Sequence, residues 1–266
     1  MEAVIRRGTP LPPERLRSII EAVRRDGFVH LPGALEVEEV EELRARVDRV
    51  FEEQAGTDYI HEGWAGVRLF EVDQLFRDMS VREPIIGIAE AVCGSTCRLV
   101  ADSLMRNPNG VAVTNWHVDD TVYFPLPEGS PPHDPRLLPV VHLIVAIPLT
   151  DIPSVEYGPT QIVPGSHCSG REPDSDDANP LFEGRGAVSM ISRRGDIYLH
   201  NNQVWHRGAP NESGRMRYLY QLIYGPAWVA QRFYTDINYA IPRHVLEGAD
   251  EHLLRVLGKP IPGVGS

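Results

Sequence analysis

Hydrophobic residues in the first part of the chain recur at helical spacing. Apolar side chains fall three or four positions apart at Leu16, Ile19, Ile20 and Val23, and residues so spaced share one face of a helix. This pattern predicts a helix over Pro12–Asp26, with prolines at its start and Gly27 at its end. A short apolar run predicts a strand over Phe28–Leu31. Similar helical patterns predict helices over Val37–Gln54 and Pro84–Val92.

The pattern changes after Arg98. Short apolar runs now alternate with segments rich in Gly, Pro and Asn, which is typical of a β-sandwich or barrel. The runs that we predict to be strands are Leu99–Arg106, Val111–His117, Val140–Leu149, Gln161–Val163, Ala187–Ile191, Asp196–Leu199 and Arg217–Tyr224.

Two of the intervening loops are long. Pro125–Pro139 is rich in proline, and Ser169–Pro180 is rich in acidic residues. Long loops in a compact domain often cover a binding site, but both segments also fit solvated surface insertions. The sequence leaves both interpretations open.

Composition narrows the class of protein. The chain has 266 residues, of which 42% are hydrophobic, and this length suits one large domain over residues 1–266. A net charge of −11 disfavours nucleic acid and anionic membrane as partners. The chain has three cysteines, an odd number, and we find neither a signal peptide nor a long apolar segment in it. We therefore expect a cytoplasmic protein. We expect its partner to be a small-molecule substrate. Oligomeric state is not readable from the sequence.

One segment carries residues suited to a metal. His117 and Asp119 are two apart at the end of a predicted strand, so their side chains point to the same face. A third ligand is needed, and His206, which follows the strand at Asp196–Leu199, is the best candidate. Two histidines and one carboxylate form the facial triad of non-haem iron(II) oxygenases. Thus His117, Asp119 and His206 are the predicted catalytic and metal-binding residues.

Other histidines and cysteines fit this site less well. His142 lies in an apolar run and is either a core histidine or a residue facing the cavity, while His167 and His200 are expected to have structural roles. Cys93 and Cys97 are four apart, but without a second pair they fit buried thiols better than a zinc site.

A cationic residue follows the third candidate ligand. Arg217 comes eleven residues after His206 and opens an apolar strand. Its planar guanidinium matches a carboxylate with two hydrogen bonds, as the far carboxylate of 2-oxoglutarate would require. Arg215 has the same strand parity and is the alternative.

Taken together, these segments resemble the phytanoyl-CoA dioxygenase family of iron(II)- and 2-oxoglutarate-dependent oxygenases. The resemblance runs from about Arg24 to Gly225. It rests on Arg25–Gly33, on His117-x-Asp119, on Gly158–His167, and on Gly195-Asp196 followed by His206 and Arg217. One departure is Tyr157 before Gly158, where the family often has Asn.

The resemblance implies a fold, cofactors and an activity. The fold would be mainly β with flanking helices: a double-stranded β-helix, or jelly-roll barrel. It would comprise a helical part at about residues 1–98, a barrel at about 99–225, and an extension over 226–266. Iron(II), 2-oxoglutarate and dioxygen would be the cofactors and co-substrates, with Arg217 and Thr160 binding 2-oxoglutarate. The carboxylate at Asp119 favours oxidation over halogenation.

The expected reaction is hydroxylation of a small or medium-sized metabolite, with release of succinate and CO2. Desaturation, cyclisation, epimerisation or endoperoxide formation would use the same cofactors and are alternatives. Alternatives of another class are a metal-binding cupin-like isomerase and a barrel that only binds a ligand. Neither the substrate nor the position of its oxidation is readable from the sequence.

Overall fold

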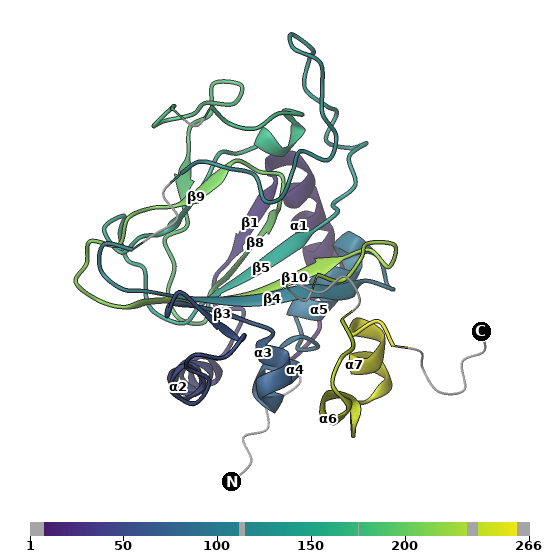
Figure 1. Cartoon of the computed structure of the whole chain (residues 1–266). Helices are drawn as coiled ribbons and strands as arrows, with labels where there is room; N and C mark the ends of the chain where they lie inside the picture. The colour runs from purple at the N-terminus through teal and green to yellow at the C-terminus, as the bar shows by residue number, and fades with distance from the viewer. Residues whose placement is uncertain (1–7, 112–114, 175, 233–238, 260–266) are drawn as a thin grey trace.

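Two antiparallel sheets form the framework of the computed structural model, which describes residues 8–111, 115–174, 176–232 and 239–259. The major sheet has seven strands in the order β1-β8-β5-β10-β4-β3-β2, and the minor sheet has the order β7-β6-β9. The strands are β1 (Phe28–Leu31), β2 (Ile60–His61), β3 (Ala65–Val67), β4 (Arg98–Asn107), β5 (Leu143–Pro148), β6 (Thr160–Ile162), β7 (Val188–Ser189), β8 (Ile197–Asn201), β9 (His206–Gly208) and β10 (Arg217–Gly225) (Figure 1).

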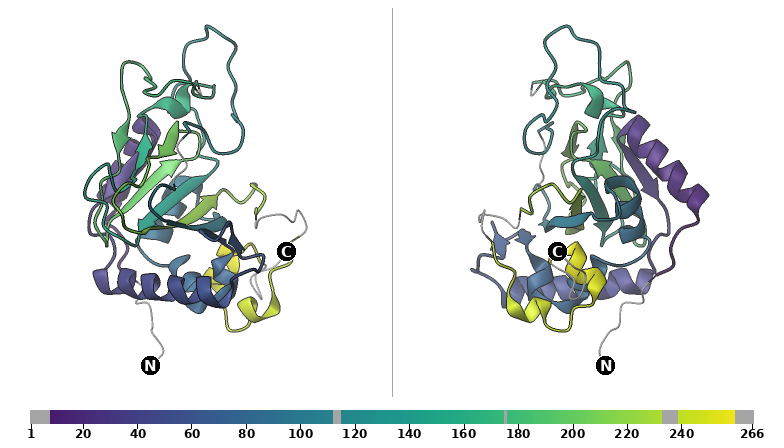
Figure 2. Two further views of the ribbon diagram at one scale, coloured as in Figure 1. Left: turned by 60° about the vertical axis from the view of Figure 1, so that its left-hand side comes forward. Right: turned by 90° about the vertical axis from the view of Figure 1, so that its right-hand side faces the viewer.

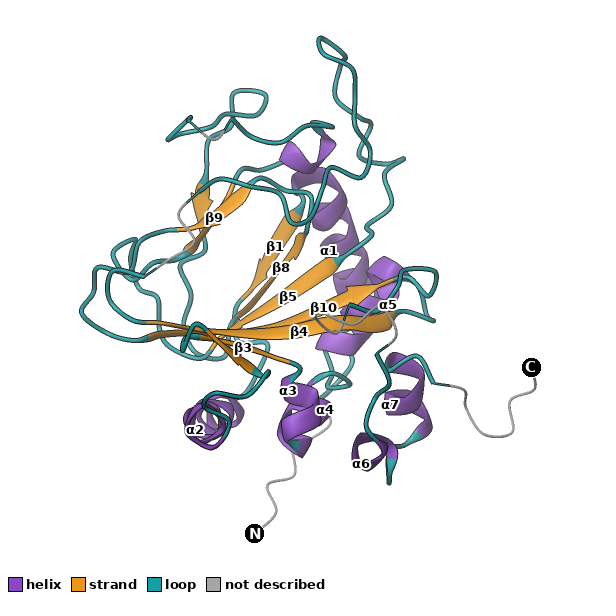
Figure 3. Cartoon of the chain, viewed as in Figure 1, coloured by secondary structure: helices purple, strands orange, loops and turns teal. Residues whose placement is uncertain are grey.

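Helices flank the major sheet. They are α1 (Pro13–Asp26), α2 (Val37–Glu53), α3 (Leu69–Val72), α4 (Gln74–Met79), α5 (Ile85–Cys93), α6 (Arg243–Leu246) and α7 (Glu251–Val256), with a 3-10 turn at Ser166–Cys168. The minor sheet and the long loops lie on the other side of the major sheet from most of the helices (Figure 3). Figure 2 shows α2 crossing the base of the molecule and α1 running along its side.

Most of the predicted elements are present, within a few residues at their ends. The exception is the strand expected over Val111–His117. Residues 112–114 lie outside the described part of the chain, and beyond them only His117 makes a β-bridge, to His206. Sequence patterns did not reveal the short strands β2, β3 and β9 or the short helices α3, α4, α6 and α7.

A glycine ends the N-terminal helix α1 and lets the chain turn into the first strand of the sheet. Gly27 ends α1 in the left-handed conformation, with φ of 81°, which glycine adopts without steric cost. A Cβ at this position would come within 2.3 Å of Val204. The chain then continues into β1, which pairs with β8, so the N-terminal part contributes a strand to the same sheet as the later segments.

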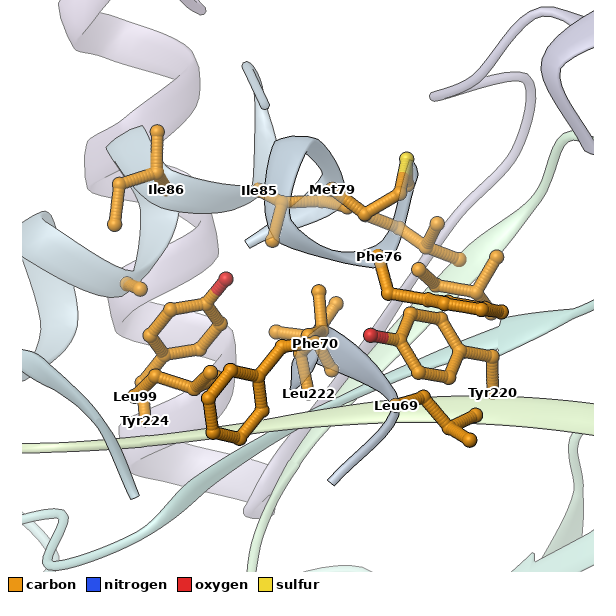
Figure 4. Close-up of a cluster of buried hydrophobic side chains, with 14 of the residues drawn as sticks. Leu69, Phe70, Phe76, Met79, Ile85, Ile86, Leu99, Tyr220, Leu222 and Tyr224 are labelled. Atoms are coloured by element: carbon orange, nitrogen blue, oxygen red, sulfur yellow. The ribbon is translucent and has the colours of Figure 1, made fainter. Parts of the chain in front are cut away.

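Alternation along β10 separates the core from the cavity. Tyr218, Tyr220, Leu222 and Tyr224 join the main hydrophobic cluster with the helices. Arg217, Leu219, Gln221 and Ile223 line a cavity on the opposite face, as the two-residue period of a strand requires. Figure 4 shows Tyr220, Leu222 and Tyr224 of β10 packed with Phe70, Phe76, Met79 and with Ile85 and Ile86 of α5.

The architecture is the predicted jelly-roll class, mainly β with flanking helices. The described strands form two separate sheets rather than one hydrogen-bonded closed barrel. Among the described residues, no helix combines the length and the apolar character that crossing a membrane requires.

Candidate metal centre

Three side chains from two segments meet at one point. His117, Asp119 and His206 each offer a ligand atom, and these atoms lie within 4.8 Å of one another. Nε2 of His117 is 3.8 Å from Oδ1 of Asp119, and Nε2 of His206 is 3.7 Å from the same oxygen. The structure therefore brings together the three residues that the sequence singled out.

Backbone carbonyls fix which nitrogen each imidazole presents. Nδ1 of His117 is 2.8 Å from the carbonyl oxygen of Asn115, and Nδ1 of His206 is 3.0 Å from that of Val204. A carbonyl oxygen only accepts hydrogen bonds, so in each ring Nδ1 carries the proton and Nε2 keeps its lone pair. Both lone pairs belong to the nitrogens near Asp119, and this arrangement orients metal-binding histidines.

Backbone pairing holds the two segments in register. His117 and His206 exchange N–H···O bonds of 3.0 Å in both directions, and the N–H of Asp119 donates to the carbonyl of Asn202 at 3.0 Å. Gln203 adds a side-chain bond from Nε2 to the Asp119 carbonyl at 3.3 Å. Asp119 itself lies outside regular strand structure, so these bonds, rather than strand alternation alone, place its carboxylate.

The three residues line a cavity of about 350 Å³ between the two sheets. Its wall includes Thr160 of β6 and His206 of β9 from the minor sheet, and residues of β4, β5 and β10 from the major sheet. The apolar part of this wall consists of Val100, Ala101, Met105, Ile144, Leu219 and Ile223. Neither long loop, 125–139 or 169–180, contributes a described residue to the wall.

Arg217 lies in the same cavity and is 5% exposed. Its Nη1 donates to the carbonyl of Gly158 at 2.5 Å, while its Nε has no hydrogen-bond partner among the described residues. No carboxylate of the described chain pairs with it, and burial lowers the pKa of its guanidinium. Arg215, the alternative, is exposed and does not line this cavity.

The second predicted cofactor contact, Thr160, is buried and lines the cavity. Its hydroxyl forms a hydrogen bond of 2.7 Å with the hydroxyl of Tyr198 on β8. Burial raises the pKa of Tyr198, and the charge of Arg217 opposes this rise. Tyr198 was not predicted from the sequence, because the pattern of a buried strand does not show which residues of other strands its side chains will contact.

The other histidines considered from the sequence, His142, His167 and His200, differ in their surroundings. His200 is buried, with its ring centre 5.0 Å from that of His206, and burial lowers its pKa well below the ordinary value. His167 binds the carbonyl of Arg24 at 2.9 Å, away from the cavity. His142, for which the sequence left two interpretations, does line the cavity. The cysteines are free and buried.

The donor set fits a divalent iron centre. It offers two imidazole nitrogens and one carboxylate oxygen, and it borders a cavity with room for further ligands. Two histidines and a carboxylate with open positions are typical of non-haem iron(II) sites. Burial, and next the neighbouring ring of His206, lowers the pKa of His117, which favours the neutral imidazole that binds metal.

Comparison with known proteins agrees with this geometry. The family model for phytanoyl-CoA dioxygenase (PhyH) matches residues 23–219. The L-proline trans-4-hydroxylase of Streptomyces griseoviridis is 26% identical over 224 residues, which cover 81% of this chain and 76% of that protein.

Solved structures show the same fold. The epimerase SnoN from nogalamycin biosynthesis superposes with a TM-score of 0.65 at 23% identity, covering 90% of this chain and 93% of its own. HygX from Streptomyces hygroscopicus, solved with nickel and 2-oxoglutarate bound, gives a TM-score of 0.63 at 19% identity over 84% of this chain and 90% of its own.

Proposed function

Because the chain belongs to the phytanoyl-CoA dioxygenase family, we propose that His117, Asp119 and His206 hold iron(II) in a 2-oxoglutarate-dependent dioxygenase that hydroxylates a small or medium-sized metabolite. The two histidines and the carboxylate would bind the metal on one side and leave the side toward the cavity for 2-oxoglutarate and dioxygen. When bound, this centre supplies oxidation of a substrate C–H bond coupled to decarboxylation of 2-oxoglutarate to succinate and CO2.

The observation that carries the proposal is the buried, unpaired cation beside the triad. Arg217 is buried, and no carboxylate of the described residues forms an ion pair with its guanidinium, whose Nε has no hydrogen-bond partner among them. Burying a charge without a partner is costly, and a dicarboxylate whose other end binds the metal would compensate it. Thr160 lines the same cavity, and with Tyr198 as the donor of their mutual hydrogen bond the Thr160 hydroxyl would be free to donate to this carboxylate.

The protein's remaining task is to hold the substrate. Leu219 and Ile223 of β10 and Ile144 of β5 give the cavity an apolar wall. Such a wall excludes water and places a C–H bond near the metal by shape. A cavity of about 350 Å³ that also takes 2-oxoglutarate leaves room for a metabolite rather than a polymer.

The first test is an anaerobic titration of the iron(II)-loaded protein with 2-oxoglutarate. The weak visible metal-to-ligand charge-transfer band is followed in wild type, Arg217→Ala and Arg215→Ala. We expect the band in all three proteins. Arg217→Ala should need about 30-fold or more additional 2-oxoglutarate, since loss of a buried charge pair costs about 2–5 kcal/mol. Arg215→Ala, which changes an exposed arginine two residues away, should match wild type.

Two results would contradict the proposal. If iron binds but no band forms in wild type, a metal-binding isomerase becomes the better interpretation. If Arg217→Ala and Arg215→Ala titrate alike, Arg217 is not the anchor. Desaturation, cyclisation, epimerisation or endoperoxide formation with the same cofactors is the alternative outcome. Product analysis separates these from hydroxylation, because hydroxylation adds one oxygen atom from dioxygen to the product, endoperoxide formation adds two, and the others add none.

We further propose that the whole chain acts as a single domain in a reducing compartment. In support, β1 from the N-terminal part pairs with β8, and Arg255 of α7, in the C-terminal extension, donates to the carbonyl of Cys97, the residue just before β4. The free thiols of Cys93, Cys97 and Cys168 suit a reducing environment.

A further inference from the structure

A second polar cluster lies in the cavity wall beside the metal centre. Asp120, His142, Asn202 and Arg232 all line the cavity, and Tyr123 joins them. These residues come from four separate stretches of the chain, and the cluster is not explained by metal or 2-oxoglutarate binding.

Tyr123 is the centre of this cluster. Its hydroxyl lies 2.6 Å from Oδ2 of Asp120, 3.0 Å from Nδ1 of His142 and 3.1 Å from Nδ2 of Asn202. Arg232 also donates to Oδ2 of Asp120. This oxygen is thus paired with a guanidinium, which always carries its charge and only donates hydrogen bonds. Asp120 is therefore an ionised acceptor.

The position of the single hydroxyl proton of Tyr123 determines which other groups of the cluster donate and which accept hydrogen bonds. An ionised carboxylate 2.6 Å away must receive that proton, because two oxygens without one would repel each other. The phenolic oxygen is then an acceptor toward His142 and Asn202. Burial lowers the pKa of His142, so its ring is neutral and has one N–H, which is placed on Nδ1. Nε2 of His142 is left with a lone pair.

Two acceptors consequently lack donors. Nε2 of His142 and Oδ1 of Asn202 have no hydrogen-bond partner among the described residues. The two residues are 5% and 1% exposed, and both belong to the cavity wall. An unpaired buried acceptor costs about 1–3 kcal/mol, and such groups usually have a partner.

We propose that His142 and Asn202 form a substrate-recognition subsite that accepts hydrogen bonds from a donor group on the substrate, either a hydroxyl or a protonated amine. This inference deepens the proposed function, on which it rests, by naming the chemical class of the substrate. The donor would lie next to the metal centre and hold the adjacent carbon skeleton against the apolar wall. Arg232 and Asp120 act as positioning residues, because they fix the proton of Tyr123.

The tautomer of His142 is tested first, by nitrogen NMR on protein with ¹⁵N-labelled histidine. The protein is loaded with 2-oxoglutarate and with zinc, a diamagnetic substitute for iron(II), and the signal is assigned by its loss in His142→Gln. We expect a protonated Nδ1 and a bare Nε2 in wild type. In Tyr123→Phe, Nδ1 loses its acceptor, and the proton should move at least partly to Nε2. A protonated Nε2 in wild type would overturn the inference.

Donor recognition is tested with three probes that share one ring: cyclopentanol, cyclopentylammonium and methoxycyclopentane, which is larger by one methyl group and has no donor. Binding is followed through the ¹⁵N signals of wild type, Asn202→Leu and Gln221→Leu. Gln221 is the matched control because it also lines the cavity, but its amide oxygen already accepts from Ser103. We expect wild type and Gln221→Leu to bind at least one donor probe about fivefold to tenfold more tightly than methoxycyclopentane, as one net hydrogen bond supplies.

The outcomes are distinct. Loss of this preference in Asn202→Leu supports the subsite, and the better of the two donor probes identifies hydroxyl or ammonium. Equal binding of all three probes to wild type, or an unchanged preference in Asn202→Leu, refutes it. The charge-transfer titration is independent of these measurements. Its failure alongside an intact donor preference would overturn the oxygenase assignment while leaving the subsite in place.

Discussion

Asp102 offers a quantitative test of how the sheet beneath the cavity is stabilised. It lies on β4, is 2% exposed, and accepts hydrogen bonds at Oδ2 from the N–H of Phe70 at 3.0 Å and from Tyr220 at 3.3 Å. Oδ1 has no hydrogen-bond partner among the described residues. Burial raises its pKa to about 7, although these hydrogen bonds oppose the rise.

Because the pKa of Asp102 is raised in the folded protein, the contribution of Asp102 to stability decreases as pH rises. The stability contribution of Asp102 is fully present below the pKa of the unfolded state, near 3.8, and is lost as pH rises through about 7. The difference of roughly three pKa units corresponds to a loss of about 4 kcal/mol. Asp102→Asn keeps an acceptor for Phe70 but never ionises, so its stability relative to wild type should rise by about 2–3 kcal/mol between about pH 5 and pH 8.5.

The assay is urea unfolding followed by tryptophan fluorescence at several pH values for wild type, Asp102→Asn and Asp48→Asn. Hydrogen bonding to Arg44 and Tyr218 lowers the pKa of Asp48 although burial opposes it, so Asp48→Asn should show a difference from wild type that is flat above about pH 5. A flat difference for Asp102→Asn as well would refute the reasoning, because it would mean that Asp102 ionises in the folded protein as easily as in water.

Further predictions concern the site. His206→Ala should weaken iron(II) binding by more than about 100-fold. Removal of a residue that only hydrogen-bonds to a metal ligand costs roughly 10–100-fold, and loss of a ligand itself should cost more. Metal competition with a chromophoric chelator measures this change. Gly158→Ala should weaken 2-oxoglutarate binding by about tenfold in the anaerobic titration. Gly158 has φ of 68°, and a Cβ would lie 2.9 Å from the Ala209 carbonyl, so strain of about 1–2 kcal/mol would displace the carbonyl that Arg217 binds. Trp205→Ala should lower the free energy of unfolding by about 3–5 kcal/mol, since Trp205 is 5% exposed.

Residue type and strand alternation were enough to predict much of the candidate site. The spacing of His117 and Asp119 and the position of Arg217 at the start of β10 are visible in the sequence, and the structure places all three in one cavity. Strand alternation pointed to Asp119, but alternation alone does not explain where its carboxylate lies. Asp119 does not lie in a regular strand; its backbone bond to Asn202 fixes its position.

Residues whose role depends on distant partners could not be predicted. Tyr123 meets His142 and Asn202 only after folding, and Arg232 reaches Asp120 across 112 positions of sequence. The strand β9, which carries His206, has three residues, too few for a hydrophobic period to appear. Local patterns record which face a residue occupies, whereas these contacts depend on which segments the fold brings together.

The turn at the end of β8 joins the metal centre to the subsite. The backbone of Asn202 accepts from Asp119 and donates to the carbonyl of His142, while its side chain donates to Tyr123. A change of this turn would therefore move the proposed metal ligand Asp119 and the proposed substrate contact together. By contrast, Leu219 and Ile223 line the cavity from β10, where the ladder with β4 and β5 fixes the backbone whatever the side chain. We infer that substrate preference can change at these β10 positions without loss of the metal centre, and that the Asn202 turn restricts such change.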